Sequence, residues 1–327
     1  MILGIESTAH TFGIGLVESG KILANVKDSY TTEKGGIIPI EAAKHHEKVA
    51  SIVYEKAIAE AKISEDKIKA IAFSQGPGLS PCLLQGIKFA KQLSSKLKVP
   101  LIPVNHCVAH LEIGRITGAK DPVLLYASGA NTQIISYSSG KFRVFGETLD
   151  IGIGNFIDSF ARAAGMGFPG GPKIAELAEK SKNYIELPYS IKGMDVAFAG
   201  MLTNLTQKLK SGKYKIEDLA YSLQETAFAM LIEASERALA HLGKNELLLG
   251  GGVACNTRLK EMARLMCEER GAKLFVPPNS LLVDNGAMIA FLGEIMFKKG
   301  IKYEGKEIET LDIKPRERTD EVDVRWR

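Results

Sequence analysis

The sequence predicts an α/β protein made of two lobes with the same basic design. Its 327 residues suffice for about two domains of roughly 150 residues each. A frame of three short strands opens the chain, and a similar frame returns about 120 residues later. Each frame is followed by helices and single strands in alternation, which is typical of α/β architecture.

The first frame joins its second and third strands through a turn at Ser19-Gly20, residues suited to a hairpin. Pro39 is expected in the first turn of the long helix that follows. We expect strands at 2–6, 12–17 and 21–26, a helix at 39–62, a strand at 69–74, a helix at about 80–97 and a strand at 101–104.

The second frame begins near residue 122. Ser139-Gly140-Lys141 repeats Ser19-Gly20-Lys21, and the turn 128–132 resembles the turn 7–11. Two matches in the same order on the same frame favour a duplicated lobe. Further expected elements are helices at 155–165, 172–181, 198–211, 216–241 and 283–298, strands beginning at 246 and within 272–278, and an edge strand in the tail after 313.

Two lobes that each open with a β-meander are the design of the actin, sugar-kinase and heat-shock ATPase superfamily. We therefore predict a two-lobed, actin-like duplicated fold with a nucleotide between the lobes. Lobe I would comprise 1–118 with the tail from about 300 to 327, and lobe II would comprise 119–299. A fold alone does not define a function.

Composition excludes several classes of protein. A net charge of +4 is too small to indicate a nucleic-acid binder by itself. The four cysteines form no CxxC pair, so a disulfide framework is not expected and a reducing compartment is. The first residues resemble a strand and not a leader, and no apolar run approaches the ~20 residues that span a bilayer. We expect a cytoplasmic protein without membrane association.

The segment His106-Cys107-Val108-Ala109-His110 carries the sharpest local signal. In a helix, histidines at i and i+4 share one face and can bind one metal ion, although an ordinary surface or core pair has the same spacing. A zincin protease is disfavoured, because that motif needs glutamate immediately after the first histidine and Cys107 stands there.

Asp284 and Tyr126 are further candidates. Asp284 precedes the last helix, where a carboxylate is either an N-cap or a third metal ligand. Tyr126 ends the first strand of the second frame, and it either packs in the core or points toward a ligand.

Three glycine-rich turns can present backbone N–H groups to phosphate or ribose. They are 128–131, 250–252 and 170–172, and the last precedes a helix whose dipole favours an anion. The chain has no GxxxxGK[ST] motif, so it is not a P-loop NTPase. Together the turns indicate a nucleotide-like ligand.

Several segments, in order, resemble one family, the universal tRNA threonylcarbamoyladenosine transferases. These are known as TsaD in bacteria and as the catalytic subunit of the KEOPS complex in archaea and eukaryotes. The similar segments are GIESTAHTFG (4–13), NHCVAH (105–110), YASGANTQ (126–133), GNFIDSFARAAG (154–165), PGGPKI (169–174), KGMDVAFAG (192–200), GGVACN (251–256), VDNGAMIA (283–290) and RTDEV (318–322). STAHTFG is similar to the archaeal and eukaryotic branch.

The resemblance implies transfer of a threonylcarbamoyl group from threonylcarbamoyl-adenylate to the adenosine beside the anticodon, in tRNAs that read codons beginning with A. It implies that one iron or zinc ion is held by His106, His110 and Asp284, with Tyr126 at or near it. Contacts to ATP, AMP or the adenylate are implied for Tyr126, Ala127, Ser128, Gly129, Ala130, Asp158, Gly171 and Asn256.

The implied partners are tRNA, a small kinase/ATPase and accessory subunits of a KEOPS-type complex, and an adenylate-forming enzyme that supplies the substrate. Ala130 and Ala175 differ from the glycine and glutamate usual in the family. An ATP-dependent phosphotransferase or ATPase of the same superfamily, or a non-catalytic scaffold, is the alternative. Paired imidazoles argue against the phosphotransferase, since Mg²⁺ prefers oxygen ligands.

Overall fold

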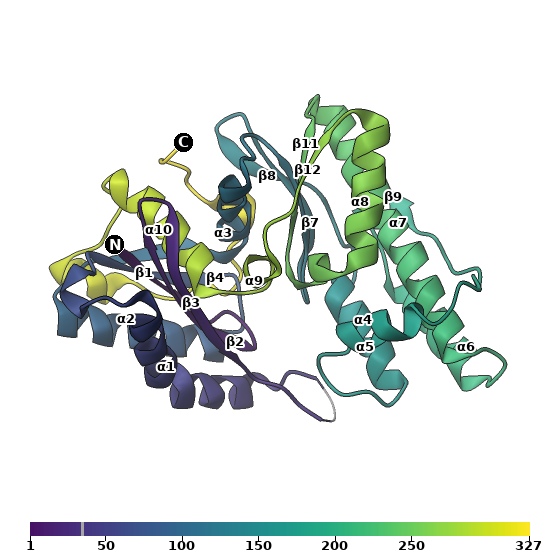
Figure 1. Cartoon of the computed structure of the whole chain (residues 1–327), viewed down its shortest axis with the longest axis horizontal. Helices are drawn as coiled ribbons and strands as arrows, with labels where there is room; N and C mark the ends of the chain where they lie inside the picture. The colour runs from purple at the N-terminus through teal and green to yellow at the C-terminus, as the bar shows by residue number, and fades with distance from the viewer. Residues whose placement is uncertain (34–35) are drawn as a thin grey trace.

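The computed structural model describes residues 1–33 and 36–327, and these form two five-stranded sheets side by side (Figure 1). The first sheet has the order β3-β2-β1-β4-β5 and the second the order β12-β11-β6-β7-β8. The first comprises β1 Ile2–Glu6, β2 Thr11–Glu18, β3 Lys21–Ser29, β4 Ala70–Gly76 and β5 Leu101–Asn105. The second comprises β6 Val123–Ala127, β7 Thr132–Ser138, β8 Lys141–Glu147, β11 Glu246–Gly250 and β12 Lys273–Phe275.

The two sheets have the same topology, as the repeated frame predicts. In each, three antiparallel strands form a meander, and two parallel strands extend the sheet beside the first strand of that meander. The matching turns even share their backbone angles: φ is 53° at Ser19 and 52° at Ser139, followed by 76° at Gly20 and 79° at Gly140. Such left-handed pairs suit tight hairpins between twisted strands.

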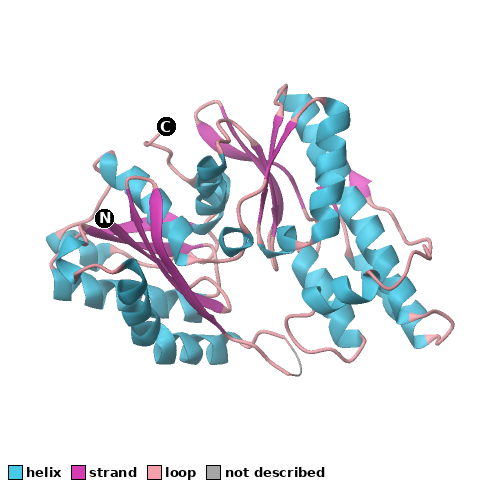
Figure 2. Cartoon of the chain, in the orientation of Figure 1, coloured by secondary structure: helices cyan, strands magenta, loops and turns pink. Residues whose placement is uncertain are grey.

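Helices cover both faces of the first sheet (Figure 2). Helices α1 (Pro39–Ala61) and α2 (Ser80–Leu97) contact one face, where Leu3 and Ile5 of β1 are buried. Helix α10 (Gly286–Lys298) contacts the other face, with Ile2 and Ala72. This alternation directs Gly4 and Glu6 toward the side of α10, since successive side chains of a strand point to opposite faces.

Helix α10 lies very close to the sheet because glycines remove side chains from the contact. A Cβ atom on Gly4 would lie 2.2 Å from the backbone nitrogen of Ala290, and one on Gly15 would lie 2.2 Å from that of Ala287. The predicted range of lobe II, 119–299, includes this helix, yet its packing is with strands of the first sheet. The division into lobes at those residues stays a proposal.

Most remaining helices lie on one side of the second sheet, and their apolar faces form one core with that face. Phe156, Phe160, Phe198 and Phe228 are fully buried there. These helices are α4 Ile153–Ala163, α5 Gly171–Ala178, α6 Ala199–Lys210, α7 Ile216–Leu242, α8 Thr257–Arg270 and α9 Asn279–Leu282, with a small hairpin of β9 Ile191–Lys192 and β10 Asp195–Val196.

The tail differs from the sequence prediction. Residues 311–327, all of them described, form no edge strand, and their only regular element is the short 3₁₀ turn η5, Thr319–Glu321. The alternation of Val322, Val324 and Trp326 suggested a strand, but these side chains contact the core around α3 (His106–Glu112) without pairing to a sheet. Among the described residues, no helix is long and apolar enough to cross a membrane.

Candidate metal and nucleotide site

The two histidines lie on one face of α3, which directly follows β5. Asn105 ends the strand in an extended conformation, and its side chain accepts a hydrogen bond from the backbone N–H of Val108 (3.1 Å), so it caps the helix. Both imidazoles are buried, and their ring centroids lie 4.8 Å apart. The i, i+4 spacing therefore has the geometry that the sequence predicts.

Asp284 and Tyr126 come from distant parts of the chain to the same point. The Oδ1 atom of Asp284 lies 3.4 Å from Nε2 of His106 and 3.4 Å from Nε2 of His110. The phenolic oxygen of Tyr126 lies 3.0 Å from Nε2 of His106. Tyr126 ends β6 of the second sheet, whereas Asp284 precedes α10, so the group joins both halves of the fold.

Glu6 belongs to the same group, and the sequence analysis missed it. Its Oε2 atom lies 3.0 Å from Nδ1 of His106, and Oε1 accepts hydrogen bonds from the backbone N–H and the hydroxyl of Thr8. The Thr8 hydroxyl also lies 3.3 Å from Nδ1 of His106. The sequence did contain a signal for Glu6: it is an acidic residue that ends the apolar strand ILGIE, immediately before the turn at Ser7-Thr8.

These contacts define the orientation of His106. A proton on Nδ1 can be donated to Glu6, which leaves the lone pair of Nε2 directed at Asp284 and Tyr126. A carboxylate that accepts from Nδ1 in this way keeps the proton on that nitrogen and makes Nε2 a more basic metal ligand. Nδ1 of His110 has no such partner among the described residues.

The charges of the group are strongly coupled. Burial alone would lower the pKa of His106, but Glu6, Tyr126 and Asp284 together raise it well above its usual value. Burial and the neighbouring His106 lower the pKa of His110. Burial opposes ionisation of Asp284, yet His106 and His110 hold its pKa well below its usual value.

The donor set fits a metal ion. The ligand atoms of His106, His110 and Asp284 lie within 4.8 Å of one another, and all three side chains are largely or fully buried. Two imidazoles and one carboxylate, with a phenol beside them, suit iron or zinc better than Mg²⁺. Metal binding would displace the proton shared within this group, because the ligands must be deprotonated.

The predicted nucleotide-binding turn follows β6. The backbone N–H of Ser128 donates to the carbonyl of Asn131 (2.9 Å), and the carbonyls of Ser128 and Gly129 accept from Gly154 and Asn155 of α4. Ala127 is buried, whereas Gly129 and Ala130 are exposed. Ala130 does not have a positive φ, so its methyl group introduces no backbone strain at this turn.

The two other glycine turns pack on β6 and on α4, the elements that flank this turn. A Cβ atom on Gly251 (φ 89°) would lie 2.3 Å from the carbonyl oxygen of Ala127, which shows that the turn after β11 packs directly on the end of β6. On α4, Oδ1 of Asp158 accepts from the backbone N–H of Gly170 (2.8 Å), immediately before Gly171 begins α5. Burial raises the pKa of Asp158. The turn 128–131 and Gly170 therefore both contact α4, the helix that carries Asp158.

Asn256 and the residues around Ala175 already have partners within the protein. Asn256 caps α8: its Oδ1 accepts from the backbone of Arg258 (2.8 Å), and its amide donates to Gln224. A ligand contact would therefore compete with these bonds. Glu176, beside Ala175, is exposed and pairs with Lys180 (3.0 Å).

Comparison with known proteins supplies the family. Residues 21–291 match the family described as TsaD, tRNA N6-adenosine threonylcarbamoyltransferase. The chain belongs to this family. It is 57% identical over 324 residues to a tRNA N6-adenosine threonylcarbamoyltransferase from Thermococcus sibiricus, covering 99% of each chain. The predicted family and its transferase activity are thereby confirmed over the phosphotransferase alternative.

Two other similarities add detail. A probable bifunctional tRNA threonylcarbamoyladenosine biosynthesis protein from Methanosarcina mazei is 54% identical over 329 residues, which cover 99% of this chain and 59% of that protein. The crystal structure of full-length HypF in the phosphate- and nucleotide-bound form aligns with a TM-score of 0.62 at 11% identity, over 91% of this chain and 55% of the other. This likeness concerns the fold and agrees with the predicted two-lobed, actin-like architecture.

Proposed function

We propose that this TsaD-family protein transfers the threonylcarbamoyl group of threonylcarbamoyl-adenylate to the exocyclic amine of the adenosine beside the anticodon. The tRNAs concerned would be those that read codons beginning with A. The observation that supports this most strongly is the convergence of His106, His110 and Asp284 with Tyr126, from both halves of a chain that belongs to this family.

In the proposed reaction, the amine nitrogen attacks the carbamoyl carbon and AMP leaves. The mixed anhydride is already activated, so the protein contributes mainly orientation and exclusion of water. An iron or zinc ion at His106, His110 and Asp284 would act as a Lewis acid that polarises a carbonyl oxygen or anchors the threonyl part. Glu6 holds His106 in the tautomer that such an ion requires.

The nucleotide part of the donor is proposed to lie along the turn 126–130. Exposed Gly129 and Ala130 leave backbone groups accessible there, and Tyr126 joins this turn to the histidine group. Gly171 begins α5 with open space around it, because a Cβ atom there would meet nothing within 4 Å. A phosphate at this helix N-terminus would be favoured by the backbone N–H groups and the helix dipole.

We propose that the protein works in the cytoplasm with tRNA, a small kinase/ATPase and accessory subunits of a KEOPS-type complex. A separate adenylate-forming enzyme would supply the donor. The net charge of +4 supports the need for partners, since robust tRNA binding draws on about 6–10 phosphate contacts. No RNA-reading module of the RRM, KH or OB type is recognisable in the sequence.

Reconstitution tests the proposal. The chain, its partner subunits and an adenylate-forming enzyme are incubated with ATP, threonine, bicarbonate and tRNA, and the tRNA nucleosides are then analysed. We expect threonylcarbamoyladenosine only when this chain is present. A mixture with the His106→Ala/His110→Ala variant serves as the control.

An active relative in the same mixture verifies the other components. If the relative modifies tRNA and this chain does not, the proposed transfer is wrong. If the double-alanine variant is as active as the wild type, the transfer stands and the role of the histidine pair is wrong.

A further inference from the structure

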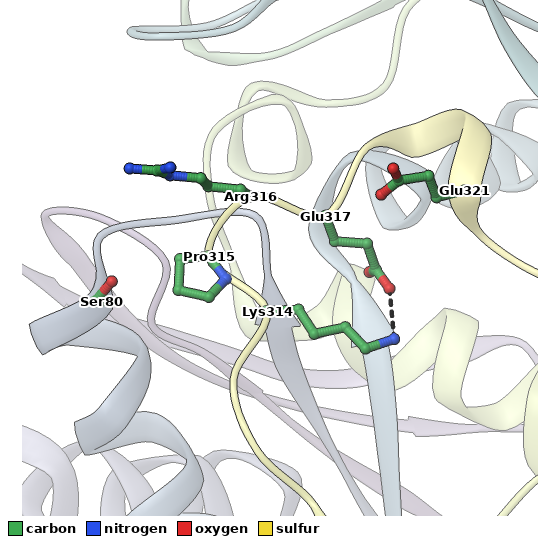
Figure 3. Close-up of a pocket in the computed structure, with 6 residues that line it drawn as sticks. All are labelled: Ser80, Lys314, Pro315, Arg316, Glu317 and Glu321. Carbon is green, nitrogen blue, oxygen red and sulfur yellow. Dashed lines mark hydrogen bonds and ion pairs between the residues drawn. The ribbon is translucent and has the colours of Figure 1, made fainter.

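The tail crosses the first sheet before it reaches α3. The backbone N–H of Lys314 donates to the carbonyl of Gln75 (2.8 Å), and that of Gly78 donates to Pro315 (3.1 Å). These bonds fix the tail at the end of β4. A pocket lies at this crossing, and Figure 3 shows its lining, Ser80, Lys314, Pro315, Arg316, Glu317 and Glu321. None of the residues predicted to bind metal or nucleotide lines this pocket.

Beyond the crossing, the tail contacts the beginning of α3. Glu317 accepts a hydrogen bond from the side-chain amide of Asn105 (2.9 Å), the residue whose oxygen caps the helix. Lys314 pairs with the other oxygen of Glu317, as the dashed line in Figure 3 marks. The tail thus holds the cap that orients His106.

The end of the tail contacts the other end of α3. Glu112, the last residue of the helix, is fully buried, and a carboxylate at a helix C-terminus is unfavourable with the helix dipole. Arg115 pairs with its Oε2 (2.6 Å), Arg327 donates to its Oε1 (2.8 Å), and the indole N–H of Trp326 donates to the same oxygen (3.3 Å). Two of these three partners belong to the tail.

The same segment also contacts the second sheet. The guanidinium of Arg327 lies over the rings of Tyr137 (4.6 Å to the centroid) and Phe142 (5.2 Å), which belong to β7 and β8. Arg318 lies 3.6 Å from Glu147 at the end of β8. Arg327 is therefore held by the meander that carries Tyr126 and at the same time holds the helix that carries His106 and His110.

We propose that Glu317–Arg327 is a clamp that positions α3 from both ends, so that it sets the alignment of His106 and His110 against Tyr126 and Asp284. Its residues are positioning residues and do not touch the reacting atoms. The expected effect on metal binding rests on the proposed metal site, whereas amide hydrogen exchange of α3 tests the clamp without any metal.

The experiment compares Arg327→Ala and Glu317→Ala, which removes the acceptor for Asn105, with the control Arg325→Ala. Arg325 is exposed, and its ion-pair partner among the described residues is the exposed Asp323. Zn²⁺ affinity is measured by competition with a chromogenic chelator, at a temperature where circular dichroism shows every variant folded. Amide hydrogen exchange of α3 is measured in the metal-free proteins.

We expect Arg327→Ala and Glu317→Ala each to weaken Zn²⁺ binding about 10-fold, the lower end of the loss seen when a group that orients a metal ligand is removed. In both variants the amides of α3 should exchange about 10-fold faster, whereas Arg325→Ala should change neither quantity. Trp326→Phe keeps one aromatic ring at this position and loses one donor to Glu112, while Arg327 still pairs with that carboxylate, so its effect should be smaller.

Unchanged Zn²⁺ affinity and unchanged exchange in both variants would overturn the clamp. A lower melting temperature with both of these quantities unchanged would show a general structural role, and it would overturn the clamp as well. If the wild type binds no Zn²⁺, the proposed metal site is wrong, and faster exchange confined to α3 would still support the clamp.

Discussion

Glu6→Gln isolates the contribution of the carboxylate behind His106. The change keeps the size of a side chain that is fully buried and removes its charge. Oε1 of Glu6 already accepts from the backbone and the hydroxyl of Thr8, at 2.7 and 2.5 Å. The amide oxygen of glutamine should keep those two bonds, which places its NH₂ group against Nδ1 of His106.

This placement reverses the hydrogen bond to the imidazole. Nδ1 would then accept a hydrogen bond from the glutamine NH₂ group, and the neutral ring would carry its own proton on Nε2, the atom that lies 3.0 Å from Tyr126 and 3.4 Å from Asp284. A metal ligand must present a lone pair at that atom. Loss of such a partner typically costs about 10–100-fold in metal affinity, or about 1.4–2.7 kcal/mol.

The assay is Zn²⁺ titration of metal-free protein against a competing chelator, followed by elemental analysis of protein purified in parallel. Glu47→Gln is the matched control, since Glu47 is exposed and pairs with Lys88 on the surface (3.0 Å). We expect a 10–100-fold loss for Glu6→Gln and none for the control. Equal affinity of wild type and Glu6→Gln, with both proteins folded, would refute the assignment of the His106 tautomer.

Four further outcomes follow from the site and the fold. His106→Ala or His110→Ala should each lose most bound metal by elemental analysis, and full occupancy of the double variant would remove the metal site. ATP should raise the melting temperature by mass action, since it stabilises the folded protein by about 2.7 kcal/mol at 100 times the Kd, and Gly129→Val should weaken this effect. The variant should still fold, because its Cβ would lie 3.5 Å from Asn155. Equal stabilisation of both proteins by ATP would contradict a nucleotide at this turn. Burial lowers the pKa of His46 to about 4, so the unfolded chain, with a pKa near 6.5, takes up a proton at a pH where the folded chain does not. Between about pH 7.5 and 5, the free energy of unfolding should therefore fall by about 2 kcal/mol more in the wild type than in His46→Leu. Urea denaturation measures this difference, and equal losses would contradict it. At about 150 mM salt, the isolated chain should bind tRNA weakly and modify it poorly until its partners are added. Tight binding and full turnover without them would refute this, and the main tRNA-binding element would then be the chain's own surface, including the tail from Arg316 to Arg327.

The sequence predicted the duplicated frame well because that information is local. The Ser-Gly turns need left-handed backbone, and the apolar alternation of each strand needs only its own residues, so both can be read without knowing what they contact. The tail shows where this reasoning stops. Val322, Val324 and Trp326 alternate like a strand, but residues 311–327 contain none, because the tail is held by side-chain contacts to α3.

The candidate site shows the same division between local pattern and tertiary contact. The helical spacing of His106 and His110 indicated a shared face, and the resemblance to the family added Tyr126 and Asp284. Only the tertiary structure placed Glu6 behind His106, because residues 100 positions apart meet through the pairing of strands and the orientation of a helix.

By itself, the sequence determined the two meanders, the alternation of helices and strands, and the paired imidazoles, since each depends on residues close together in the chain. The tertiary structure alone decided that α10 packs on the first sheet, that Asn256 caps α8, and that Glu112 pairs with Arg327. The physical reason is that burial and charge pairing depend on which distant surfaces meet. The close approach of α10 at Gly4 and the buried carboxylate of Glu112 exist only once those surfaces are in contact.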